Sequence, residues 1–152
     1  MDVFVDTNAL TLLLLGATNI NYIESHPKLS VYTKEDYLLL QSYVCSPHRI
    51  VTTPNIWTET DNHCNGLNGS DRYSYLGLFR KIVSDSLEKF VTTNDAVKSD
   101  YFLPVGLADC ITLDAAQECD LLITGDSQLA DYARGLSIEV VDLKLVANIR
   151  LA

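Results

Sequence analysis

The chain has 152 residues and is 47% hydrophobic, which suits one domain with a sizeable core. We therefore treat residues 1–152 as a single domain. The formal net charge of −9 at pH 7 argues against a broad nucleic-acid-binding surface, because such surfaces carry a basic stripe. It does not exclude a local site in which bound metal ions offset the acidic charge.

Strand and helix patterns alternate through the first half of the chain. An apolar run at 3–5 predicts a buried strand, residues 8–15 predict a helix, and residues 16–32 are expected to be mostly loop. The next elements have clearer start signals and are a helix capped by Thr33 and running to about Cys45, a strand at 50–53, a helix from Pro54 that carries Trp57 and Glu59, and a helix from Ser70 to about Ser86.

The second half continues the alternation. In chain order we expect a strand at 89–92, a short helix at 95–100, a loop at 103–106, a helix at 107–118, a strand at 121–124, a helix at 127–134 that stops at Gly135, a strand at 138–141, and a last helix capped by Asp142. This order predicts an α/β fold with three layers, α/β/α, around a mostly parallel central sheet of about five strands.

The apolar run at 9–17 is too short to span a bilayer, and no positive charge precedes it as in a signal peptide. Two interpretations stay open for it, a dimer face and a helix buried against the sheet. The four cysteines form no Cys-x-x-Cys pair, so we expect them to be buried in a chain kept in a reducing, cytoplasmic compartment.

Four acidic residues stand where an α/β fold would bring them together. Asp6 ends the first apolar run and Asp126 follows the run at 121–124, while Glu59 and Asp109 lie near helix starts. Ligands bind at the carboxyl ends of parallel strands, and carboxylates collected there hold hard divalent cations. We therefore predict that these four residues bind one or two hard divalent cations, an arrangement that can activate a water molecule against a phosphodiester.

The polar neighbours of the strand-end acids are expected to hydrogen-bond the carboxylates or bound water, and they are Thr7, Asn8, Thr124 and Ser127. Three of the four acids also have a purely structural interpretation. Asp6, Asp109 and Asp126 all stand where a carboxylate can cap the helix that follows.

Other candidates carry weaker signals. Glu59 and His63 are four residues apart and share a helix face, but one such pair is weak evidence for zinc. The basic residues Arg72, Arg80 and Lys81 are possible contacts to a phosphate backbone, with a solvated helix face as the alternative.

Four stretches of the chain together resemble the PIN-domain family, in its toxin-type ribonuclease form, and they are Val3–Leu10, Pro54–Glu59, Gly106–Ile111 and Leu122–Ser127. The resemblance implies a parallel sheet between helices and a Mg²⁺- or Mn²⁺-dependent endoribonuclease. It places the metal ligands at the four acids named above. It also implies an RNA substrate, an antitoxin protein as partner, and a homodimer. Gln128 stands where many members have a further acid.

Two other classes of function compete with a nuclease. A phosphoaspartyl domain of the dehalogenase type would have Asp-x-Asp after its first strand, but this chain has Asp6-Thr7-Asn8. A receiver-like domain would have a lysine after a late strand, and Thr124-Gly125-Asp126 offers none. The second class is a binding module that keeps the fold and has lost the metal.

Overall fold

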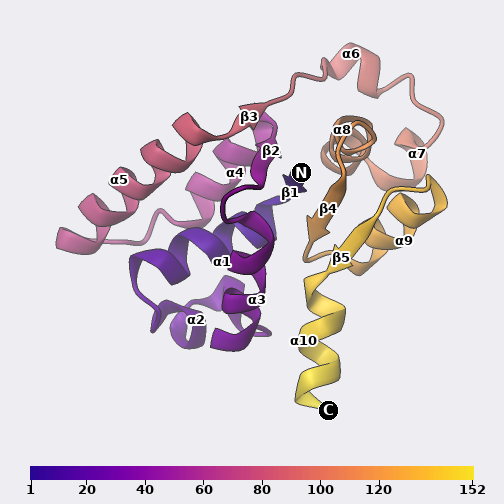
Figure 1. The fold of residues 1–152 in the computed structure, drawn as a ribbon. Coiled ribbons are helices and arrows are strands. Elements are labelled where there is room, and N and C mark those ends of the chain that lie inside the picture. Colours follow the sequence, from indigo (N-terminus) through magenta and orange to yellow (C-terminus); the bar gives the residue numbers. More distant parts are fainter.

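The computed structural model describes residues 1–152 and has an α/β architecture, as the sequence predicts (Figure 1). Its five strands are β1 (Asp2–Val5), β2 (Arg49–Thr52), β3 (Leu87–Glu88), β4 (Leu121–Thr124) and β5 (Val140–Asp142). The ten α-helices and one 3₁₀ turn are α1 (Thr7–Thr18), α2 (Tyr22–Ser25), η1 (Pro27–Leu29), α3 (Lys34–Val44), α4 (Pro54–His63), α5 (Gly69–Asp85), α6 (Thr93–Ala96), α7 (Phe102–Val105), α8 (Leu107–Ala116), α9 (Ser127–Gly135) and α10 (Leu143–Leu151).

All five strands are parallel, in the order β3-β2-β1-β4-β5. Helices α1 to α5 lie together on one side of the sheet and α6 to α9 on the other, which gives the three layers (Figure 1). The chain moves outward from β1 through β2 to β3, then crosses back to β4 and moves outward to β5. The strand order therefore reverses between β1 and β4, and such switch points are where parallel sheets bind ligands.

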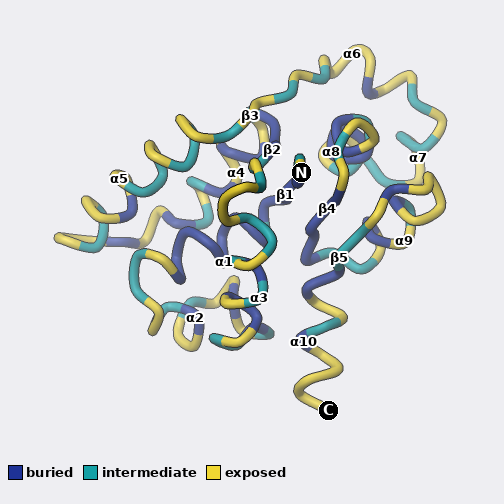
Figure 2. Tube along the Cα trace, in the orientation of Figure 1, coloured by how far each residue is buried: buried dark blue, intermediate teal, exposed yellow.

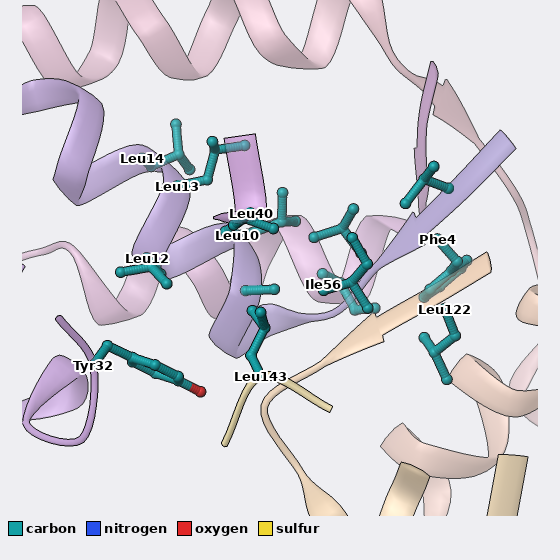
Figure 3. Packing of buried hydrophobic residues seen from close by; sticks show 14 of the residues in the cluster. Phe4, Leu10, Leu12, Leu13, Leu14, Tyr32, Leu40, Ile56, Leu122 and Leu143 are labelled. Atoms are coloured by element: carbon teal, nitrogen blue, oxygen red, sulfur yellow. The ribbon is translucent and has the colours of Figure 1, made fainter. Parts of the chain in front are cut away.

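Helix α1 is the centre of the core. It is apolar on every side, and all residues at 9–16 are buried within the chain. Leu10, Leu12 and Leu14 are fully buried and belong to the same hydrophobic cluster as the strand residue Phe4 (Figure 3). Each such side chain contributes about 1.5–3 kcal/mol when it leaves water. Of the two interpretations left open for this run, the structure shows the buried helix.

Close packing also explains the glycine at position 16 of α1. A Cβ atom at that position would lie 2.5 Å from the Tyr37 ring of α3, so only glycine allows the two helices to approach this closely. Helix α1 extends to Thr18, beyond the predicted end. The rest of the predicted loop at 16–32 is also wrong in part, because it contains α2 and η1, which are too short to show a periodicity.

The structure corrects the predicted bounds of two strands and replaces one predicted loop by a short helix. The predicted strand at 89–92 is β3 at 87–88, since Leu87 and Glu88 pair with β2 in register. The strand predicted at 138–141 is β5 at 140–142, because Val140 to Asp142 pair with β4. The predicted loop at 103–106 is mostly the short helix α7, which ends at Gly106 with φ +82°.

The four cysteines differ in their exposure to solvent. All four cysteines are free, but Cys45 is exposed at the end of α3, so the expectation that all are buried is wrong. No helix is long and apolar enough to cross a membrane.

Candidate metal centre

The four predicted acids line one cavity of about 150 Å³ at the carboxyl edge of the sheet. Asp6 follows β1 directly, and Asp126 lies two residues after the end of β4, which is the neighbour of β1. Glu59 comes from the middle of α4 and Asp109 from the first turn of α8. The two helices lie on opposite faces of the sheet, so the cavity stands at the switch point and receives acids from both layers.

Asp6 is the most firmly held of the four acids. Its Oδ1 accepts a hydrogen bond from Ala9 N–H at 3.0 Å, and its Oδ2 accepts one from Gly125 N–H at 3.2 Å. The hydroxyl of Thr124 also donates to Oδ2. Burial raises the pKa of Asp6 from 3.8 to about 6, although these hydrogen bonds act to lower it. Asp6 is thus both a helix cap and a carboxylate that is costly to ionise.

Gly125 allows the close contact between the ends of β1 and β4. A Cβ atom there would clash with Tyr32 Oη and would lie 2.8 Å from Asn8 Cβ. A side chain at this position would therefore displace the backbone N–H that binds Asp6. Asn8 itself lines the cavity.

Asp126 also caps a helix, but it uses only one oxygen to do so. Its Oδ1 accepts hydrogen bonds from Gln128 N–H at 2.9 Å and Leu129 N–H at 3.1 Å. The backbone N–H of Asp126 donates to Thr124 Oγ1 at 2.9 Å, so Thr124 links the two strand-end acids. Oδ2 of Asp126 receives no hydrogen bond from the protein.

Asp109 does not act as a cap. The residue at the N-cap of α8 is Gly106, and no side-chain capping bond is formed there. The pKa of Asp109 is raised by burial and by the negative charges of Asp126 and Glu59. Asp109 accepts no hydrogen bond from the protein. The capping interpretation that the sequence left open for Asp109 is therefore wrong.

Glu59 is oriented by the residue that follows Asp6. Its Oε2 accepts a hydrogen bond from Thr7 Oγ1 at 2.8 Å. His63, one turn further along α4, turns to Thr11, whose Oγ1 lies 3.2 Å from His63 Nδ1. The Thr11 hydroxyl donates its own proton to Thr7 O at 2.7 Å. In the contact between Thr11 and His63, the donor is therefore His63 Nδ1–H and the acceptor is Thr11 Oγ1. His63 supports α1 and does not line the cavity.

The donor set fits a hard divalent cation. Four carboxylate oxygens receive no hydrogen bond from protein donors, namely Oε1 of Glu59, Oδ2 of Asp126 and both oxygens of Asp109. Oxygen ligands of this type suit Mg²⁺ and Mn²⁺. In this conformation no three acidic, histidine or cysteine side chains form a ready-made ligand set.

The backbone supplies positive potential to this acidic cavity. Its lining includes residues from the first turns of α1, α4 and α8 and the N-cap of α9. The N-terminal end of each helix carries a partial positive charge, which stabilises nearby anions. The four helix ends therefore offset part of the repulsion between the carboxylates, and they would also favour a phosphate group.

The remaining predicted residues lie elsewhere. Ser127 begins α9 beside Asp126 but its hydroxyl makes no hydrogen bond to any of the four acids. Arg72, Arg80 and Lys81 lie on α5, and none of them lines the acidic cavity. Lys81 lines a separate groove with residues of α3 and β2.

Two polar lining residues were not among the predicted site residues, Asn55 and Thr112. Each carries a weak signal in the sequence. Asn55 is the second residue of the helix that starts at Pro54, and Thr112 is three residues after Asp109, on the same helix face.

No family model and no curated protein matches this chain.

Proposed function

We propose that this chain is a Mg²⁺- or Mn²⁺-dependent endoribonuclease of the PIN type. One observation carries the proposal: four acids from both layers of the fold line a single cavity at the switch point of the sheet, and four of their oxygens face no protein donor. Glu59, Asp109 and Asp126 would hold the ion through these oxygens. Asp6 would complete the set through the lone pairs left on its hydrogen-bonded oxygens.

Bound Mg²⁺ or Mn²⁺ supplies an activated water and charge stabilisation for phosphodiester hydrolysis. The chain's own residues provide the framework for this chemistry. Thr124 ties the carboxylate of Asp6 to the backbone of Asp126, and Thr7 fixes the rotamer of Glu59. The helix N-termini around the cavity favour the phosphate of the substrate. The preferred substrate is single-stranded or loop RNA, because an unstacked backbone can enter a small cavity.

The same arrangement weakens the competing interpretation as a phosphoaspartyl domain. The cavity lining contains four acids and no basic residue, so no lysine stands ready to bind a phosphoryl group on Asp6. The cleavage experiment described next distinguishes the nuclease from a binding module without metal.

The test is cleavage of a panel of single-stranded and hairpin RNAs by the purified chain with Mn²⁺ or Mg²⁺. We expect cleavage that stops with chelator and is poor with Ca²⁺, whose looser coordination positions water less well. Asp109→Asn is the sharpest variant, because it removes a carboxylate that holds no part of the fold. It should lower the rate at least ~100-fold, on the order of 3 kcal/mol of transition-state stabilisation, and Asp6→Asn should do the same.

Asp100→Asn is the matched control, because Asp100 is exposed and lines none of the cavities. It changes the net charge by the same amount and should cleave at the parental rate. Equal cleavage by the parent and Asp109→Asn, or no cleavage by the parent across the panel with Mn²⁺, would favour the binding module.

The resemblance also motivates a role as the toxin of a toxin–antitoxin pair, with a homodimer and an antitoxin protein as partners. Expression of the chain in a bacterial host should then arrest growth, and Asp109→Asn should relieve the arrest. Growth arrest of equal strength with the variant would contradict a toxic nuclease.

A further inference from the structure

A second pocket opens beside the acidic cavity. It has a volume of about 150 Å³, and its lining consists of Thr53, Pro54, Asn55, Phe90, Val91, Thr93 and Ile111. Asn55 lines both this pocket and the acidic cavity. A ligand held at the four acids can therefore extend past Asn55 into the second pocket.

Phe90 is the unusual member of this lining, because it is 80% exposed although aromatic. Its backbone is nevertheless well anchored. Lys89 N–H donates to Thr52 O at 2.8 Å directly after β3, and Thr92 caps α6 through Asp95 N–H at 3.1 Å. Phe90 lies between these two fixed points, at the start of the exposed segment that arches from β3 to α7 (Figure 2). The backbone that carries the ring is thus anchored at the edge of the pocket.

The polar groups of the pocket suit the edge of a nucleobase. The hydroxyl of Thr53 donates to Oδ1 of Asn55, which leaves the NH₂ group of Asn55 as a donor between the two cavities. The hydroxyl of Thr93 is a further polar group of the lining. No charged residue lines the pocket, so a neutral ring is the part of an RNA strand that it fits best.

We propose that this pocket is a nucleobase subsite, in which an unstacked base next to the scissile phosphodiester stacks on Phe90. The inference rests on the proposed nuclease function, and it names a residue that determines how that nuclease holds its substrate. Stacking on aromatic side chains is a common way to hold single-stranded RNA, since every base has a π-face.

The lack of basic side chains at the site supports such a subsite. Neither the acidic cavity nor the second pocket contains a lysine or arginine. Lys89 precedes Phe90, but its Nζ is paired with Glu118 at 2.6 Å. Contacts from basic side chains to the phosphate backbone are therefore scarce near the site, and stacking on Phe90 would add to the binding that the metal ion and the helix N-termini give to the phosphate.

The experiment compares Phe90→Ala with Tyr73→Ala. Tyr73 is the matched control, because it is an aromatic residue that is 82% exposed and lines none of the cavities. Cleavage of a mixed-sequence single-stranded RNA is measured with Mn²⁺, and binding of the fluorescein-labelled RNA is measured by anisotropy with Ca²⁺. Phe90→Ala should raise both KM and Kd about tenfold, the order expected from one base–aromatic stack. Tyr73→Ala should leave both unchanged, and Phe90→Tyr should restore them.

Abasic RNAs identify the base. The KM of the parent should rise about tenfold when one nucleotide flanking the cleaved bond lacks its base. The KM of Phe90→Ala should not change with the same RNA, because the effects of removing the two partners of one contact are not additive. If the parent cleaves RNA and Phe90→Ala matches it on every substrate, the subsite is wrong while the nuclease stands. If the parent neither binds nor cleaves any RNA, the nuclease proposal fails and this inference fails with it.

Discussion

The pH dependence of stability provides a direct test of the acidic cavity, and Asp6→Asn is the perturbation. Asp6 is 6% exposed, and burial raises its pKa from 3.8 to about 6 in the metal-free protein. At about 1.4 kcal/mol for each unit of pKa, the difference between 3.8 and about 6 amounts to about 3 kcal/mol. This is the free energy by which ionised Asp6 destabilises the folded state, relative to the protonated form.

The direction follows from the raised pKa. The folded state binds this proton more tightly than the unfolded state does, so the contribution to stability is complete below pH 3.8 and is lost as pH rises through about 6. Asparagine does not titrate. The stability of the parent minus that of Asp6→Asn should therefore fall by about 2–3 kcal/mol between pH 4 and pH 7.5, whatever hydrogen bonds the amide keeps.

The assay is urea unfolding in chelator at several pH values, followed through the fluorescence of Trp57. This is the only tryptophan of the chain, and it is buried with its ring centroid 5.4 Å from that of Phe79. A stability difference that stays constant over this range, or that grows with pH, would refute the reasoning. A second arm adds Mn²⁺ at pH 7.5, where the ion should stabilise the parent and have little effect on Asp6→Asn.

Three further predictions concern neighbouring residues. Asp109→Asn should raise the metal-free Tm at neutral pH by roughly 2–4 °C, for about 1 kcal/mol of relieved repulsion, and should abolish the stabilisation by Mn²⁺; a lower Tm with an intact Mn²⁺ response would contradict its role as a ligand. Thr7→Val should lower kcat about tenfold with little change in KM, because Glu59 loses the donor that orients it, and Thr7→Ser should restore kcat; equal kcat for both variants would contradict this. Gly125→Ala should cost about 1–3 kcal/mol in urea unfolding, and Tyr32→Phe in the same chain should recover part of it by removing the hydroxyl that meets the new Cβ; a cost unchanged by the second substitution would place the clash elsewhere.

Much of the fold could be predicted because its signals are local. The apolar run before Asp6, the threonine at position 33 and the proline at position 54 each mark an element boundary through the chemistry of a few adjacent residues, and the structure places elements at all three. Element boundaries that depend on a partner strand were predicted less well. β3 stops at Glu88 because β2 ends at Thr52, and nothing within residues 87–92 encodes that limit.

The candidate site divides in the same way. Asp6 and Asp126 each follow an apolar strand and each cap the next helix. These two properties could be predicted from the sequence, because each depends only on neighbours along the chain. The tertiary structure decided that β1 and β4 are adjacent, so that the switch point lies between these two acids. It also brought Glu59 and Asp109 to the same cavity from opposite layers of the fold.

The tertiary structure likewise determined which oxygens of the acids remain free, and it placed Phe90 at the second pocket. A carboxylate is available to a ligand only where no backbone N–H or hydroxyl has already used it, and those donors come from residues up to 119 positions away, as for Gly125 and Asp6. Local sequence fixes the hydrogen-bonding capacity of each side chain and the helix or strand that carries it. Strand order, register and packing between layers arise from contacts between distant segments, and these contacts decide which of the acids can act together.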